Sequence, residues 1–187
     1  PNVEDTNLEI NKTKFSLDEF ISERADDLAL YQDQGYAEQY ISWLERVKLS
    51  EKSIRPNSRE LEEAAARNLF KVMAYKDEYE VARLFTSPKF MSALTEQFDG
   101  DYSISYNFAP PLFARIDPIT GNPRKIEFKG WWMTPVLKII SRLRFLRASK
   151  LDIFGYHRDR QIERKFLRQY KEILTMVLSD LNSVNFD

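Results

Sequence analysis

The stretch NLFKVMAYKDEYEVARLF, residues 68–85, decides how this chain folds. Its apolar side chains would surround a helix on all sides, which is typical of a helix buried in a protein core. We therefore predict one long central helix over residues 58–85, which ends before Ser87-Pro88 because the residue before a proline avoids the helical region. Five charged side chains are packed into the same turns: Lys76, Asp77, Glu78, Glu80 and Arg83.

The charged residues of this helix have two different predicted roles. Lys76, Glu80 and Arg83 share one side, where ion pairs along a helix contribute about 0.2–0.5 kcal/mol each. Asp77 falls on the apolar face, where an unpaired carboxylate is costly. We expect Asp77 to form a structural ion pair with the basic second half of the chain, where the candidates are Arg124, Lys125, Arg142 and Arg144. A catalytic acid is the alternative, although no second carboxylate, His or Cys lies on that face.

Composition limits the class of protein. The chain has 187 residues, of which 43% are hydrophobic and 13% aromatic, enough for one domain with a real core. No apolar run approaches the roughly 20 residues of a membrane-spanning helix, and no secretory signal is present. We therefore expect a cytoplasmic protein that binds no membrane. Because the chain opens on Pro1, we expect a fragment of a longer polypeptide.

The chain has no cysteine and one histidine, His157. Without thiolates it has no disulfide, no Cys nucleophile and no cysteine ligand for zinc or an iron–sulfur cluster. His157 lies in the segment GYHRD, where it could position a base. A cap or a surface residue is the favoured interpretation for a single histidine near the start of a helix. We expect no catalytic residue, metal or cofactor in this chain.

The net charge of −1 hides a strong asymmetry. Residues 1–66 hold 8 basic against 15 acidic side chains, and residues 124–171 hold 14 against 4. The favoured interpretation is that these segments face each other or a partner domain, because the overall charge gives no long-range attraction to polyanions. The alternative is a surface for nucleic acid or for phosphates, built from Arg142, Arg144 and Arg147. Trp131-Trp132 could anchor a partner, but core or helix-staple packing is the favoured interpretation.

Elsewhere the periodicity predicts a mainly α fold. Residues 1–15 are expected to be a linker or tail, and residues 16–187 a single helical domain. A small antiparallel β element is expected over about 101–128, because residues 101–108 alternate and Asp117-Pro118 and Gly121-Asn122 are typical of turns. About six helices are predicted around the central buried one, over roughly residues 16–31, 36–52, 58–85, 88–98, 134–146 and 159–181.

Three long stretches also resemble a known family. They are ARNLFKVMAYKDEYEVARLF (residues 66–85), APPLFARIDPITGNPRKIEF (109–128) and LDIFGYHRDRQIER (151–164). Together they are similar to the C-terminal domain of fused indolepyruvate (2-oxoacid) ferredoxin oxidoreductases. The resemblance extends over about residues 16–181.

The resemblance implies a parent activity. The family decarboxylates arylpyruvates or related 2-oxoacids on thiamine diphosphate with Mg²⁺, passes electrons through [4Fe–4S] clusters to ferredoxin, and forms acyl-CoA. Because this chain lacks a glycine-rich diphosphate loop and any cysteine, none of the family's cofactor residues has a counterpart here. The resemblance therefore implies a non-catalytic accessory domain, whose partners are the catalytic domains of the same parent chain. It also implies a parent that is a homo-oligomer.

Two other functions compete with this one. The first is a docking site within the same enzyme, where the basic residues 124–171 would bind ferredoxin or the phosphates of coenzyme A. The second is nucleic-acid binding by the same arginines, which is the least favoured, so that no nucleic-acid partner is expected.

Overall fold

The structure is a computed structural model that describes residues 16–108 and 125–186. The prediction of a mainly α fold with a small antiparallel β element is confirmed. The described residues form seven α-helices, one short 3-10 helix (η1) and one two-stranded sheet. In chain order they are α1 (Leu17–Tyr31), α2 (Gln34–Ile54), α3 (Glu60–Met73), α4 (Glu78–Phe85), α5 (Pro88–Gln97), β1 (Ser105–Phe108), β2 (Ile126–Lys129), α6 (Gly130–Arg142), η1 (Leu143–Leu146) and α7 (Arg158–Asp180).

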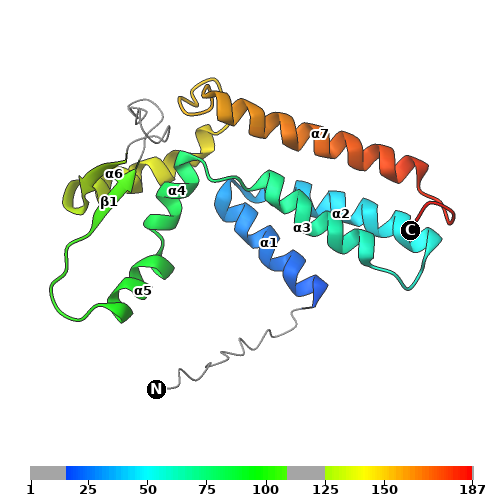
Figure 1. Ribbon diagram of the computed structural model, residues 1–187, viewed down its shortest axis with the longest axis horizontal. Helices are drawn as coiled ribbons and strands as arrows, with labels where there is room; N and C mark the ends of the chain where they lie inside the picture. The colour runs from blue at the N-terminus through cyan, green and yellow to red at the C-terminus, as the bar shows by residue number, and fades with distance from the viewer. Residues whose placement is uncertain (1–15, 109–124, 187) are drawn as a thin grey trace, which may run out of the picture.

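The described elements gather into two lobes (Figure 1). The larger lobe contains α1, α2, α3 and α7, and the smaller lobe contains α4, α5, α6, η1 and the β-ribbon. Each lobe has its own apolar cluster. In the larger lobe it includes Tyr40, Leu44, Leu69 and Met73, all of them buried, and in the smaller lobe it centres on Ala82, Tyr106 and Leu137.

The prediction of one long central helix is wrong, because the helix is interrupted between Met73 and Glu78. Asp77 starts α4 as its N-cap, and its Oδ1 accepts a hydrogen bond of 2.8 Å from the backbone N–H of Glu80. The hydrogen bond by which an aspartate side chain caps a new helix competes with the backbone hydrogen bonds that would continue the preceding helix. The break sends the two halves into different lobes, so that α3 packs on α2 and α7 while α4 packs on α6.

The start of α3, at Glu60, lies two residues after the predicted start at residue 58. The N-cap is Arg59, which makes no side-chain capping bond. The buried carboxylate of Glu51, on α2, takes that role by accepting hydrogen bonds from Leu61 N (3.0 Å) and Glu62 N (2.8 Å). A negative charge at a helix N-terminus satisfies free N–H groups and complements the helix dipole. A tertiary contact therefore takes the place of a local side-chain cap at this helix start.

The β-ribbon leads directly into α6. Its strands are antiparallel, with Tyr106 opposite Phe128. The helix begins at Gly130 rather than at the expected Thr134, so that Pro135 lies inside it. Gly130 N donates to Ile104 O at 2.8 Å, and a Cβ at position 130 would lie only 2.5 Å from that oxygen. This close approach requires glycine. The expected turns at Asp117-Pro118 and Gly121-Asn122, like the tail over residues 1–15, lie outside the described residues.

Candidate functional site: the lobe junction and two exposed helix faces

A buried ion pair joins the two lobes. The Arg147 guanidinium holds both carboxylate oxygens of Asp77, with Nε–Oδ2 at 2.5 Å and Nη2–Oδ1 at 2.8 Å. Arg147 Nη1 also donates to the backbone oxygen of Tyr31 at the end of α1, and the guanidinium lies 3.7 Å from the Tyr31 ring centroid. Both ionic side chains are about 3% exposed. Three segments that are distant in sequence therefore meet at one cation.

The junction has the chemistry of a structural contact. Burial is the largest single influence and disfavours the charged guanidinium, but the hydrogen bonds that Arg147 donates to Asp77 and the attraction of the surrounding Asp77 and tyrosine oxygens together outweigh it, so that the pKa of Arg147 lies above its ordinary value. The Asp77 carboxylate is occupied on both oxygens, by Arg147 and by the N–H of Glu80. No part of it faces an open hollow among those found in the described residues. This arrangement is that of a structural ion pair rather than of a carboxylate that could contact a substrate.

Within the described residues, the cation that pairs with Asp77 is Arg147 and not one of the candidates Lys125, Arg142 and Arg144. Lys125 and Arg142 are exposed, and Arg144 donates instead to the backbone oxygen of Leu30 at 2.6 Å. Arg124 lies outside the described residues. The sequence suggests Arg147 as a phosphate ligand, but its burial against Asp77 removes it from any phosphate-binding surface.

The other charges of the opening stretch separate in space. Glu80 and Arg83 form a two-bond ion pair on α4, at 2.6 and 2.7 Å. Lys76 precedes α4 and is exposed, so it does not share a helix face with them. Within the described residues Lys76 forms no ion pair, and its backbone oxygen accepts a long hydrogen bond of 3.5 Å from Arg160.

Two carboxyls near the junction have perturbed ionisation. Burial raises the pKa of Glu78 and the pKa of Glu163 above the ordinary glutamate value, while Arg160 opposes the shift. Arg160 lies 2.6 Å from Glu163 and 3.9 Å from Glu78. Raised carboxyl pKa values occur at catalytic sites, but also in structural ion-pair networks. Neither of the two hollows described below is lined by these side chains, which favours the structural role.

His157 lies at the N-terminus of α7. Its Nδ1 accepts a long hydrogen bond of 3.4 Å from the backbone N–H of Asp159, and it stands 3.5 Å from the carboxylate of the same residue. Its φ and ψ are extended, as expected for an N-cap residue. This geometry matches the favoured interpretation of a helix cap.

A tightly held loop connects η1 to α7. Asp152 is buried at its centre and accepts hydrogen bonds from Tyr79 Oη (3.1 Å), Ala148 N (2.8 Å) and Gly155 N (2.9 Å). Three of the side chains that the loop displays are strongly exposed and largely apolar: Leu151, Ile153 and Tyr156. A second hollow, of about 240 Å³, lies beside this loop.

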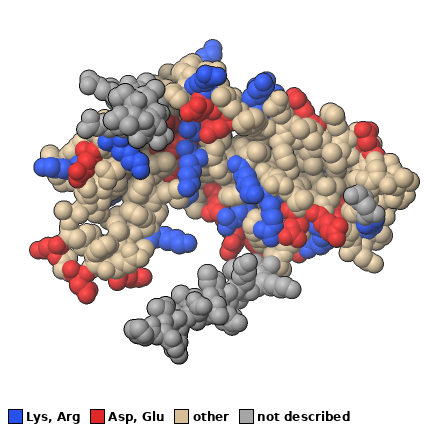
Figure 2. Space-filling model, in the orientation of Figure 1, with Lys and Arg blue, Asp and Glu red and all other residues tan. Residues whose placement is uncertain are grey.

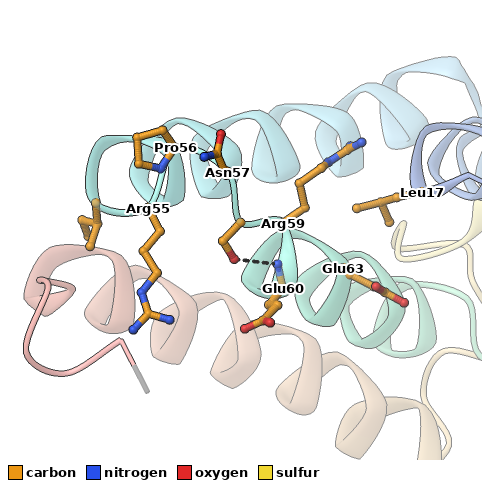
Figure 3. A pocket seen from close by; sticks show the side chains of 9 residues that line it. Leu17, Arg55, Pro56, Asn57, Arg59, Glu60 and Glu63 are labelled. Carbon is orange, nitrogen blue, oxygen red and sulfur yellow. Dashed lines mark hydrogen bonds between the residues drawn. The ribbon is translucent and has the colours of Figure 1, made fainter.

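Another hollow, larger than the one beside the loop, lies where α2 meets α3 (Figure 3). Its volume is about 640 Å³, and it is open to solvent. The side chains that line it do not converge, since Arg55 and Arg59 point in different directions in Figure 3. Arg59 pairs with Asp18 at 2.6 Å and with Glu62 at 2.8 Å, and Arg55 stacks on Phe186. We assign no ligand to this hollow.

The cofactors of the resembled family would need donors among the described residues. Among residues 16–108 and 125–186 no three His, Asp or Glu side chains come together as a metal-ligand set. The sequence supplies no thiolate for a cluster. We therefore derive no chemical step through thiamine diphosphate, Mg²⁺ or an iron–sulfur centre on these residues.

One face of α6, which Leu143 extends at the start of η1, is apolar and has no cover from the described residues. Trp132, Val136, Ile139 and Leu143 recur at spacings of four, three and four, and each is more than a third exposed. The opposite face carries Leu137 into the core of the smaller lobe. Trp131 is 80% exposed, so the packing interpretation is wrong for it, whereas Trp132 contacts Phe128 edge-on. The helix is apolar on both sides, but only one side has a partner within the described residues.

A second uncovered apolar face lies on α7. Leu174 is buried against the larger lobe, and Leu167, Tyr170 and Leu178 pack beside it. Another row is largely exposed: Ile162 (37%), Phe166 (56%), Ile173 (56%), Met176 (62%) and Val177 (39%). A stripe of this kind usually faces a partner.

Charge does not mark a binding surface on the face that Figure 2 shows. Lys and Arg side chains are interspersed there with Asp and Glu, and neither sign forms a single large patch (Figure 2). In the described ranges, no helix is both long enough and apolar enough to cross a membrane.

The contacts of two residues, Arg147 and Glu51, are not predicted from the sequence. Arg147 and Glu51 act over long sequence separations, so no local pattern identifies their partners. Asp77 did carry a signal, because Glu80 follows it at the spacing of a capping box. That signal predicts a helix start at the position where periodicity suggested a helix interior.

Comparison with known proteins gives one match. No curated protein and no solved structure matches this chain. Residues 17–187 match DUF6537, which is described as a family of unknown function. Because the match covers nearly the whole chain, this protein belongs to the DUF6537 family.

Proposed function

We propose that this chain is a non-catalytic docking domain of a multidomain 2-oxoacid ferredoxin oxidoreductase of the indolepyruvate type. The observation that supports a docking role is the uncovered apolar face of α6, formed by Trp132, Val136, Ile139 and Leu143 with Trp131 beside it. Soluble monomers rarely expose large contiguous apolar patches, which usually mark a binding surface. The choice of enzyme rests on the sequence resemblance alone.

In this proposal the partner of the α6 face is the catalytic part of the same enzyme. That part decarboxylates the arylpyruvate and transfers electrons to ferredoxin, while this chain contributes contact surface and no reacting group. Trp131 and Trp132 suit such a role, because tryptophans are enriched among the residues that dominate binding energy at interfaces. The buried junction at Asp77 and Arg147 would hold the α6 face in a fixed position relative to the larger lobe.

The proposal is tested with the variant Ile139→Glu. Ile139 is 58% exposed, so the substitution leaves the domain folded but places a carboxylate at the centre of the α6 face. Leu49→Glu is the matched control, because Leu49 is similarly exposed on α2, away from this face. Binding of each purified chain to the remaining domains of the enzyme is measured by calorimetry.

We expect Ile139→Glu to weaken this binding at least about thirtyfold, the size of a central interface residue, and Leu49→Glu to leave it unchanged. Arylpyruvate-dependent reduction of ferredoxin by the reassembled enzyme should fall in parallel. Equal binding by both variants would remove the α6 face from the interface. Turnover of a 2-oxoacid by the purified chain alone, or a redox centre bound to it, would overturn the non-catalytic role.

A further inference from the structure

The exposed apolar row of α7 has the spacing of a coiled-coil seam. Ile162, Phe166, Gln169, Ile173 and Met176 follow one another at intervals of four, three, four and three. This alternation keeps side chains on one narrow stripe, which is what a second helix packs against. All five are exposed, while the neighbouring face of the same helix packs on α3. In Figure 1, α7 runs along an edge of the molecule, where another helix has access to it.

The seam is nearly symmetric about its centre. Ile162 and Met176 lie seven residues on either side of Gln169, and Phe166 and Ile173 lie three and four residues away. When two identical helices pair antiparallel about Gln169, every apolar seam residue therefore meets an apolar residue of the other copy. The central Gln169 would meet its own counterpart, as polar seam residues that fix register do.

The flanking charges favour the same arrangement. Lys165 and Glu172 are seven residues apart on one flank of the seam, both exposed, and neither forms an ion pair within the described residues. In an antiparallel pair the same flank of each helix meets, so Lys165 lies opposite Glu172 of the second copy, and this contact occurs twice. A parallel pair would instead set Lys165 and Glu172 against Tyr170 and Val177 of the second copy. Charge complementarity thus selects antiparallel self-association.

We propose that α7 is a dimerisation helix, which pairs antiparallel with α7 of a second copy of this chain around a two-fold axis at Gln169. The contact is isologous, because the same residues contribute from both copies. It uses α7 rather than α6, so it does not depend on the function proposed above. A single pair of helices of this length forms a small interface, and we expect a dimer whose population rises with concentration.

A charge exchange tests the contact between the copies. Lys165→Glu sets carboxylates against Glu172 at both symmetric contacts, and Glu172→Lys sets ammonium groups against Lys165. Each single variant should raise the dimer dissociation constant about tenfold in sedimentation equilibrium, since both contacts change from attraction to repulsion. The double variant Lys165→Glu/Glu172→Lys should recover wild-type association. A monomeric wild-type chain, or a double variant no better than the single ones, would overturn the proposal.

Cysteine cross-linking tests the direction of pairing, because the natural chain has no thiol. Gln169→Cys lies on the proposed axis and should form a disulfide-linked dimer under mild oxidation. Ile162→Cys should not, because fourteen residues at about 1.5 Å each separate its two copies by about 21 Å, beyond the reach of a disulfide. Leu49→Cys, at a position 71% exposed on α2, is the control and should stay monomeric. Efficient cross-linking at Ile162, at all three positions or at none would contradict the antiparallel dimer.

Discussion

Removing the charge of Asp77 by a conservative substitution is expected to destabilise this protein strongly. Asp77 and Arg147 are both buried and share two hydrogen bonds. Asp77→Asn leaves a guanidinium that is buried without its counter-ion, and breaking a buried pair from one side costs about 3–5 kcal/mol. Asparagine caps a helix as well as aspartate does, so the N-cap of α4 survives and the loss reports on the ion pair alone.

A set of variants separates the contributions. Asp77→Ala should cost about 1 kcal/mol more than Asp77→Asn, because it also removes the hydrogen bond to Glu80 N. Arg147→Met, which further deprives the Tyr31 carbonyl of its donor, should be at least as harmful as Asp77→Asn. The double variant Asp77→Asn/Arg147→Met should cost less than the sum of its parts, because neither charge is then left alone.

Urea unfolding followed by circular dichroism measures these free energies, and calorimetry measures the midpoint. For a chain of this size each kcal/mol lowers the midpoint by about 2–4 °C, so Asp77→Asn should lower it by roughly 6–20 °C. Because each lobe has its own apolar cluster, we also expect the variant to melt in two steps. If Asp77→Asn stayed within about 0.5 kcal/mol of the natural protein, the range of an ordinary surface substitution, the reasoning would be refuted.

Three further predictions concern other contacts. Glu51→Ala should cost about 3 kcal/mol in urea unfolding, because two N–H groups of α3 lose a charged acceptor, whereas exposed Glu45→Ala should change little. Burial raises the pKa values of Tyr31 and Tyr36, so the folded state keeps phenol protons that the unfolded state loses above about pH 10. The free energy of unfolding should therefore fall as the pH rises above about 10. Simultaneous ionisation of all nine tyrosines in an absorbance titration of the native protein would contradict this. Titration with ferredoxin or coenzyme A at low and high salt should show no salt-sensitive binding, because Arg144 and Arg147 make internal contacts; tight low-salt binding would revive the basic docking site.

The sequence predicts most helices well because a helix is a local structure. Ser16 and Glu19 form the capping box that their spacing indicates, and both backbone bonds are present at the start of α1. The stripe of the last helix likewise locates α7 to within one residue at each end. The predicted helix over residues 58–85 is wrong because its apolar periodicity indicates one continuous helix, whereas Asp77 caps the start of a new one.

The candidate site is less predictable for a physical reason. That Asp77 needs a partner follows from the cost of an unpaired buried carboxylate, but its identity depends on the path of seventy intervening residues. The amphipathic pattern of α7 shows that the helix is apolar, but not which part of the stripe packs on α3 and which part stays exposed.

The sequence by itself determined where most of the helices form, because backbone hydrogen bonds and caps join residues that are three or four positions apart. Only the tertiary structure decided that Arg147 holds Asp77, that Glu51 caps α3, and that α6 and α7 each keep an apolar face uncovered. These contacts depend on how the helices pack, and packing is set by the whole chain rather than by neighbours in sequence.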